Sequence, residues 1–146
     1  MNRTIWLDMD GTMADLYGVK NWLPMLEAHD ETPYRVAKPL VRMATLARML
    51  NNRQRKGYRV CVISALAKNS TNAYDTAVMK AKLTWLKKHL ASVRFDEIRF
   101  VPYTYVKNNA NNGNDILCDD EARHLDAWTG ETINAKNLIA GLKTLA

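Results

Sequence analysis

Two acidic residues near the N-terminus are spaced in a way that suits metal or acid–base chemistry. Asp8 and Asp10 follow an apolar, β-forming segment at 3–7 and precede Gly11. Residues two apart in an extended chain point to the same side, so we expect the two carboxylates to lie close together. Neighbouring carboxylates repel each other unless a cation or a proton compensates. The alternative is a plain loop in which Asp10 and Gly11 form a turn.

A second acidic pair stands far away in the sequence, again after an apolar segment. Asp119 and Asp120 follow the run at 115–118, and Ser64 follows another apolar run at 59–63. The carboxyl ends of parallel strands meet at one edge of a sheet, and ligands bind beyond that edge. Hard oxygen ligands from two elements, completed by waters, are what Mg²⁺ requires. The two acidic pairs therefore predict a metal site with Mg²⁺ as the cofactor.

Apolar runs alternate with segments of helical periodicity along the chain. We expect strands at 3–7, 59–63, 97–101, 115–118 and, as a short edge strand, 131–133. We expect helices that begin at Pro39, run over 76–90 and 121–128, and follow an N-cap at Asn134. This alternation predicts an α/β fold with a largely parallel sheet and right-handed crossovers.

The composition is that of one globular domain with an uneven charge distribution. The chain has 146 residues, 47% of them hydrophobic, and no apolar run approaches the ~20 residues that span a membrane. The net charge is +6, and the segment 32–94 holds fourteen Lys or Arg against one acid, Asp75. This basic stretch fits an anionic substrate or, alternatively, a solvated face. Cys61 and Cys118 lie in apolar runs, which predicts buried thiols and a reducing, cytoplasmic environment.

Four segments together resemble a known family. Residues 7–15 (LDMDGTMAD) resemble the first motif of the haloacid dehalogenase-like (HAD) phosphatases, within them that of the 5'(3')-deoxyribonucleotidases and their phage and bacterial relatives. Residues 60–64 (VCVIS) are similar to the second family motif, and 116–120 (ILCDD) to the fourth. Residues 82–86 (KLTWL) resemble a helix of the nucleotidases. The resemblance implies a Rossmann-like three-layer sandwich with a mainly parallel sheet of about five strands, as a single domain over 1–146.

The resemblance also implies roles for the acidic residues. Asp8 is expected to be the nucleophile that forms an aspartyl-phosphate, and Asp10 the general acid and then the general base. Mg²⁺ is expected to bind Asp8, Asp119 and the backbone carbonyl of Asp10, with Asp120 close by. Ser64 is expected to hydrogen-bond a phosphate oxygen.

The third family motif is a lysine that bridges the phosphate and the carboxylates, and two residues compete for it. Lys107 lies in the loop after the third strand, where this lysine is expected, and we favour it. Lys82 lies on the preceding helix and is predicted to be a second phosphate contact. The alternative for both is a solvated surface lysine, the ordinary state of a basic residue.

The chain departs from the family between its first and second motifs. Nucleotidases of this type carry a helical cap there that selects the substrate, whereas here only residues 16–37 are available before Pro39. We expect a short cap-like insert of one or two helices beside Asp8, with Trp22, Leu23 and Leu26 packed inward because so short an insert needs support from the core. The phosphate pocket is then expected to be open on one side.

Three aromatic residues and a basic segment are candidates for binding the substrate. Tyr17, Trp22 and Tyr34 are expected either to stack on a base or to pack the insert on the core. The basic segment 35–59 is a candidate flank for an anionic chain. His124 is expected to be a structural residue of its helix.

These features predict a Mg²⁺-dependent phosphomonoester hydrolase that acts through an aspartyl-phosphate. The expected partner is a phosphorylated small molecule, most of all a nucleoside monophosphate. No membrane partner is expected. Two alternatives remain: a nucleic-acid 3'-phosphatase with an open site, and a non-catalytic HAD-like binding module. The retained acidic residues and lysines argue against the non-catalytic module.

Overall fold

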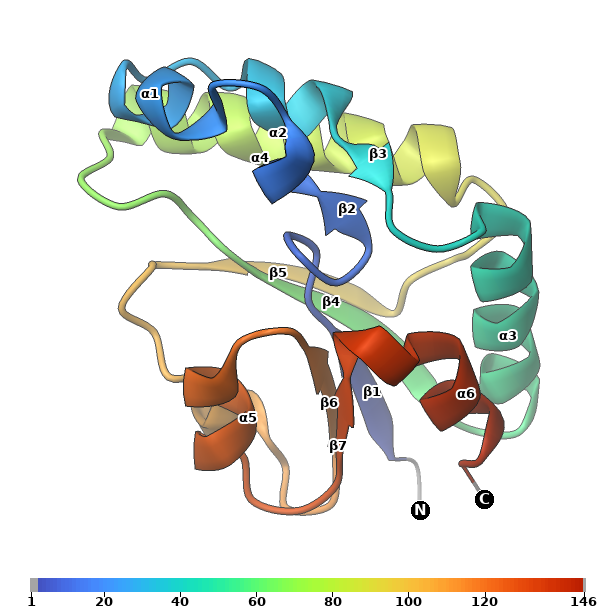
Figure 1. The fold of residues 1–146 in the computed structure, drawn as a ribbon. Coiled ribbons are helices and arrows are strands. Elements are labelled where there is room, and N and C mark those ends of the chain that lie inside the picture. The colour runs from blue at the N-terminus through green and yellow to red at the C-terminus, as the bar shows by residue number, and fades with distance from the viewer. Residues whose placement is uncertain (1–2, 146) are drawn as a thin grey trace.

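A sheet of five parallel strands forms the centre of the molecule. The computed structural model describes residues 3–145 and is shown in Figure 1. The strand order is β5-β4-β1-β6-β7, and all four neighbouring pairs are parallel. The strands are β1 (Thr4–Leu7), β4 (Arg59–Ala65), β5 (Glu97–Val101), β6 (Ile116–Asp119) and β7 (Thr132–Asn134). The predicted α/β architecture with a mainly parallel sheet is confirmed, including the edge strand near residue 132.

The central strands are apolar on both faces because helices cover both sides of the sheet. Along β1, Ile5 and Leu7 belong to one buried cluster and Trp6 to another, as the alternation of side chains in a strand requires. Figure 1 shows α3 and α6 on one side of the sheet and α5 on the other. The helices around the sheet are α3 (Met43–Arg55), α4 (Asn72–His89), α5 (Ala122–Ala127) and α6 (Leu138–Lys143). The result is a three-layer sandwich.

Local capping moves two helix starts away from their predicted positions. The Thr71 hydroxyl accepts a hydrogen bond from the Tyr74 amide at 3.1 Å, so α4 begins at Asn72, one turn earlier than expected. Asn134 does act as a cap, but for the 3₁₀ helix η3 (Ala135–Asn137), and α6 begins after it.

Pro39 does not begin a helix, and this prediction is wrong. Residues Lys38–Pro39 form a short strand, β3, that pairs antiparallel with β2 (Ala14–Asp15). The Leu40 amide also donates to the Met13 carbonyl at 2.9 Å, which holds the chain extended, and α3 starts only at Met43. The β2–β3 pair therefore brings together the two ends of the segment 16–37.

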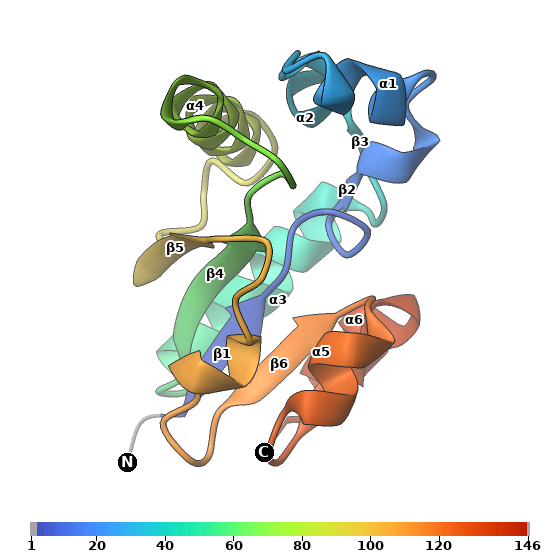
Figure 2. The ribbon, with the colours of Figure 1, turned by 90° about the vertical axis from the view of Figure 1, so that its left-hand side faces the viewer.

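Residues 16–37 lie between β2 and β3 and form the insert. It contains a 3₁₀ helix, η1 (Leu16–Gly18), and the short helices α1 (Trp22–Glu27) and α2 (Thr32–Val36). Figure 2 shows α1 and α2 together, next to α4 and away from the amino ends of the strands. Trp22 and Leu26 pack against a buried cluster that includes Tyr74 of α4, whereas Leu23 is 50% exposed. The inward packing expected of Leu23 is therefore wrong.

The insert is also tied to α4 by two hydrogen bonds, one in the loop between α1 and α2 and one at residue 37. The Tyr74 hydroxyl donates to the Asp30 carbonyl at 2.9 Å, and the Trp85 indole Nε1 donates to the Ala37 carbonyl at 2.7 Å. Both donors are buried side chains of one long helix. The short insert thus takes its stability from α4, as its length predicts.

Cys61 and Cys118 are buried on β4 and β6, as predicted. Between residues 3 and 145, no helix is both long and apolar enough to cross a membrane.

Trp85 links the insert, α4 and the core, so its removal should be costly. We expect Trp85→Ala to lower the free energy of unfolding by about 3–5 kcal/mol, because it leaves a cavity and an unpaired Ala37 carbonyl. Thr84→Ala, at the exposed neighbouring position, should change it by less than about 0.5 kcal/mol. Urea unfolding of both variants measures the difference, and equal values would contradict this description of Trp85.

Candidate active site

The carboxyl ends of the three central strands bring the predicted residues to one edge of the sheet. Asp8 follows β1 directly, and its amide donates to the Cys118 carbonyl on β6 at 3.0 Å. Asp119 is the last residue of β6, and Ser64 is the penultimate residue of β4. Residues more than a hundred positions apart in the chain therefore meet because the strands are parallel and in register.

Three carboxylates from these strand ends form one cluster. Asp8, Asp119 and Asp120 each present an oxygen atom, and these atoms lie within 4.8 Å of one another. Burial, followed by repulsion from Asp8, raises the pKa of Asp119, and the same two causes raise the pKa of Asp120 to about 8. When all three carboxylates are ionised, the cluster therefore carries more negative charge than its surroundings neutralise.

Lys107 lies between the first two of these carboxylates. Its Nζ donates to Asp8 Oδ1 at 2.9 Å and to Asp119 Oδ2 at 2.6 Å, and the side chain is buried. Burial alone would lower the pKa of this lysine, but the two carboxylates outweigh it and raise the pKa. The lysine comes from the 3₁₀ helix η2 (Lys107–Ala110) after β5, in the loop where it was expected.

Lys82 holds the other carboxylate of the first motif. From the middle of α4 its Nζ donates to Asp10 Oδ2 at 2.9 Å, to Ser64 Oγ at 2.6 Å and to the Ala65 carbonyl at 2.8 Å. The Asp10 carboxylate is thus directed at Lys82 and does not belong to the three-carboxylate cluster. Neither lysine is a solvated surface residue, which excludes the simpler interpretation of both.

Thr12 and Gly11 support the cluster, and the sequence analysis assigned them no role. The Thr12 hydroxyl, which is buried, donates to Asp8 Oδ2 at 2.9 Å. Gly11 has φ +82°, and a Cβ atom at this position would collide with the Asp120 carboxylate. The Asp-x-Asp-Gly-Thr order could have signalled both contacts, because a tight turn after Asp10 returns the chain toward Asp8.

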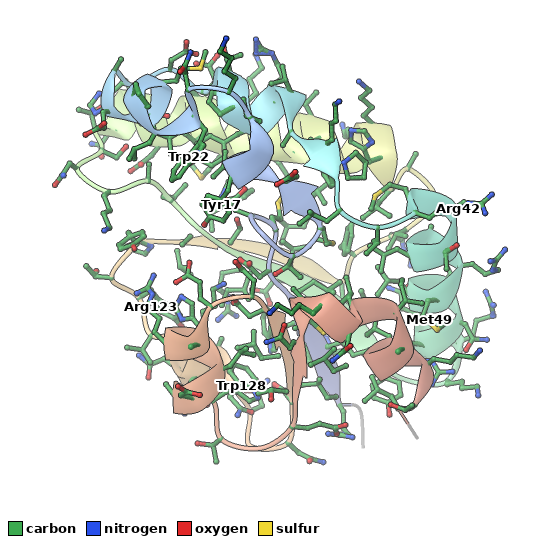
Figure 3. All side chains as sticks on the ribbon, in the orientation of Figure 1. Tyr17, Trp22, Arg42, Met49, Arg123 and Trp128 are labelled. Carbon is green, nitrogen blue, oxygen red and sulfur yellow. The ribbon has the colours of Figure 1, made fainter. Side chains whose placement is uncertain are left out.

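A cavity of about 590 Å³ lies over this strand edge. Asp8, Asp10 and Lys107 line it, and the insert supplies a largely aromatic and aliphatic wall that includes Tyr17, Trp22 and Tyr34. Figure 3 shows Tyr17 and Trp22 at the insert, and their rings meet edge to face with centroids 4.9 Å apart. Tyr17 is 45% exposed, so this wall is open to solvent.

Two of the predicted phosphate-binding residues stand behind the cavity. Ser64 and Lys82 are fully buried and do not line it. At the end of β4 the lining is formed by the next residues along the chain, Ala65, Leu66 and Ala67.

The part of segment 35–59 that forms the basic helix α3 does not line the cavity, contrary to the prediction for this stretch. Arg42, just before α3, lies at the opposite end of the molecule from Tyr17 and Trp22 in Figure 3. Besides Lys107, the lining lysine is Lys68. Lys68 and Arg123 each lie 4.6 Å from the centre of the ring of Tyr103, another lining residue. Charge counted along the sequence could not distinguish these positions.

His124 is buried on α5 and lines the cavity. Burial, and then the charge of Lys107, lowers the pKa of its imidazole to about 4, so the ring is neutral at pH 7. Its amide and carbonyl take part in the hydrogen bonds of α5 and its C-terminal end. This position is compatible with the structural role predicted for His124. The sequence did not predict that His124 also lines the cavity.

The donor set of the carboxylate cluster fits Mg²⁺. The three donors are carboxylates, which are the hard oxygen ligands this ion prefers. The raised pKa values of Asp119 and Asp120 fit a place where a further cation would relieve repulsion. Asp8, Asp119 and Asp120 are therefore the side chains that would hold the ion. Asp10 could contribute only its backbone carbonyl while its carboxylate stays on Lys82.

Comparison with known proteins supports the fold. No protein-family model matches the chain, and no curated protein matches its sequence. Among solved structures, the fold is similar to that of D,D-heptose 1,7-bisphosphate phosphatase from Burkholderia thailandensis, with a TM-score of 0.58 and 12% sequence identity. The match covers 99% of this chain and 100% of that chain. At this identity the likeness shows a shared fold, and it confirms the predicted Rossmann-like α/β architecture with a mainly parallel sheet.

The raised pKa of Asp120 gives a sign to the pH dependence of stability. In the metal-free protein the folded state holds this proton up to about pH 8, whereas the unfolded chain releases it near pH ~4. Between these values the folded state binds more protons, so the contribution of Asp120 to stability falls as pH rises. Asparagine carries no such proton, so the free energy of unfolding of Asp120→Asn should rise relative to that of the unaltered protein as the pH increases from 5 to 8. This range lies between the unfolded pKa near ~4 and the folded pKa of about 8.

Thermal unfolding at several pH values, with and without millimolar Mg²⁺, measures this difference. Mg²⁺ should raise the melting temperature of the unaltered protein more at pH 8 than at pH 5, and should raise that of Asp120→Asn less. A Mg²⁺ effect that is absent at both pH values, or unchanged in the variant, would contradict the assigned cation site.

Proposed function

We propose that the protein is a Mg²⁺-dependent phosphomonoester hydrolase that acts through a phosphorylated Asp8. One observation carries the proposal: two carboxylates, Asp8 and Asp10, line one cavity and each is held by its own buried lysine. Two carboxylates in different surroundings can serve different chemical roles. The fold shared with a bisphosphate phosphatase supports this function.

In the first step a carboxylate oxygen of Asp8 attacks phosphorus, and the bond from phosphorus to the leaving oxygen breaks. Asp10 gives a proton to that oxygen, so the product leaves as a neutral alcohol. A carboxylate nucleophile divides one difficult displacement into two easier ones. Lys107 and Thr12, which hold the two Asp8 oxygens, fix the direction of attack.

In the second step Asp10 acts as the base. It takes a proton from a water molecule, and the water oxygen attacks the phosphorus atom of the aspartyl-phosphate. The bond to Asp8 breaks, which restores the carboxylate and releases inorganic phosphate. The same residue serves in both directions because it ends the first step deprotonated.

Charge on the transferring group must be neutralised for either step to proceed. Lys107 supplies one positive charge beside Asp8 at the floor of the cavity. Mg²⁺ held by Asp8, Asp119 and Asp120 would supply further electrostatic stabilisation of the phosphoryl oxygens.

The insert supports a nucleoside monophosphate as the substrate. Tyr17 and Trp22 give the cavity an aromatic wall on which a base can stack, while Tyr34 contributes to the lining from a buried position. The volume of about 590 Å³ falls in the range of small-molecule sites. The position of α3 away from Tyr17 and Trp22 weakens one of the two arguments for a polymeric substrate, the basic stretch, and leaves the open side of the cavity as the other.

The two carboxylates should respond differently to substitution. Asp8→Asn should remove Mg²⁺-dependent phosphate release from every monoester, because an amide is a poor nucleophile. Asp10→Asn should reduce release from a nucleoside monophosphate by about 10²–10⁴-fold, and much less from p-nitrophenyl phosphate, whose leaving group needs little protonation. Asp126→Asn, on the exposed surface of α5, is the control and should match the unaltered protein.

A phosphate-release assay over nucleoside monophosphates, sugar phosphates and 3'-phosphorylated oligonucleotides tests the proposal. Release from none of them with Mg²⁺ would overturn it. Equal losses for Asp10→Asn on both kinds of leaving group would remove the acid role from Asp10. Preference for the oligonucleotide, weakened steeply by salt, would instead favour the nucleic-acid 3'-phosphatase.

A further inference from the structure

Lys82 makes three hydrogen bonds and has no donor left over. An ammonium group has three N–H donors, and here they go to Asp10, to Ser64 and to the Ala65 carbonyl, at 2.6–2.9 Å. The side chain is fully buried in the middle of α4. A buried ammonium with every donor used is fixed in place, because moving it would leave a charge and its acceptors unpaired.

The position of Lys82 separates it from the cavity. Of the two buried lysines, only Lys107 lines the cavity. Lys82 instead contacts Asp10, and it is Asp10 that lines the cavity. To reach a bound phosphate, Lys82 would have to give up one of its three acceptors. This geometry does not fit the direct phosphate contact that the sequence predicted.

We infer that Lys82 is a positioning residue for Asp10, an assignment that rests on the proposed hydrolase function. Within residues 3–145, the hydrogen bond to the Asp10 carboxylate comes from Lys82 and reaches Oδ2. Oδ1 is therefore the oxygen left to carry the proton to and from the reacting groups. Lys82 sets which oxygen faces the leaving group and holds the carboxylate in that orientation.

The anchors of Lys82 connect Asp10 to three other parts of the fold. Ser64 and Ala65 lie at the carboxyl end of β4, and Lys82 itself comes from α4. The buried ring of Tyr34, from α2 of the insert, lies with its centroid 4.8 Å from the Lys82 Nζ, within reach of a cation–π interaction. The orientation of the proton-transferring group thus depends on the strand, the long helix and the insert together.

Steady-state kinetics of Lys82→Met on two substrates test the inference. With a nucleoside monophosphate we expect kcat to fall by about 10–100-fold and KM to change by less than about threefold, because a transition-state contribution is lost. With p-nitrophenyl phosphate kcat should fall by less than about fivefold, since its leaving group needs little protonation. Lys80→Met, an exposed lysine two residues away on α4, is the matched control and should leave both substrates unaffected.

A double-variant cycle keeps the test valid if Lys82→Met folds poorly. In an Asp10→Asn background the Lys82→Met change should cost less than about twofold in kcat on either substrate, because the group that Lys82 positions is already lost. This double variant also carries no unpaired buried charge at the pair. Thermal unfolding of all variants shows which of them are folded and comparable.

The outcomes separate the inference from the function beneath it. If the unaltered protein hydrolyses no monoester, the proposed function fails. If it hydrolyses them, but Lys82→Met raises KM equally for both substrates and also raises the inhibition constant of inorganic phosphate, Lys82 is a phosphate contact. That result would overturn the inference. A large additional loss of kcat in the Asp10→Asn background would also overturn it.

Discussion

The structure depends on compensating several carboxylates that the fold buries at one edge of a sheet. Asp8, Asp10 and Asp119 are brought there by the strands or the turn that follows, and Asp120 adds a fourth carboxyl group. Ionised groups are costly in a low-dielectric interior unless partners neutralise them. Two lysines provide this, Lys107 for Asp8 and Asp119, and Lys82 for Asp10. The remaining excess of negative charge, reflected in the raised pKa of Asp120, is the physical ground for the cation proposed at this edge.

The elements outside the central strands are arranged around this compensation. α4 delivers Lys82 from one direction, and the loop after β5 delivers Lys107 from another. The insert packs on α4 through Tyr74 and Trp85, so the helix that holds Lys82 also carries the wall of the cavity. Figures 1 and 2 show the insert and α4 together at one end of the molecule. In the proposed mechanism, binding a substrate against the insert and orienting Asp10 would therefore involve the same packed unit.

Sequence reasoning succeeded where a residue's position follows from a strand. The ends of β1, β4 and β6 placed Asp8, Ser64 and Asp119 together, because parallel strands share their direction and side-chain period. It failed where an individual contact decides the conformation. Pro39 suits a first helical turn, but pairing with Ala14 extends it. The contacts of Lys82 depend on where its three acceptors lie in space. The position of α3 away from Tyr17 and Trp22 depends on the whole path of the chain.

The central claim is that Asp8 carries the phosphoryl group while Asp10 only transfers protons. Acid quenching of a single turnover with Mg²⁺ and a nucleoside monophosphate, followed by fragment mass spectrometry, measures which residue carries it. We expect one phosphoryl group on Asp8 and none on Asp10, with more of it retained in Asp10→Asn when p-nitrophenyl phosphate is the substrate. Phosphate release at the full rate with no phosphorylated Asp8 at any time, or phosphoryl transfer to Asp10, would contradict the account.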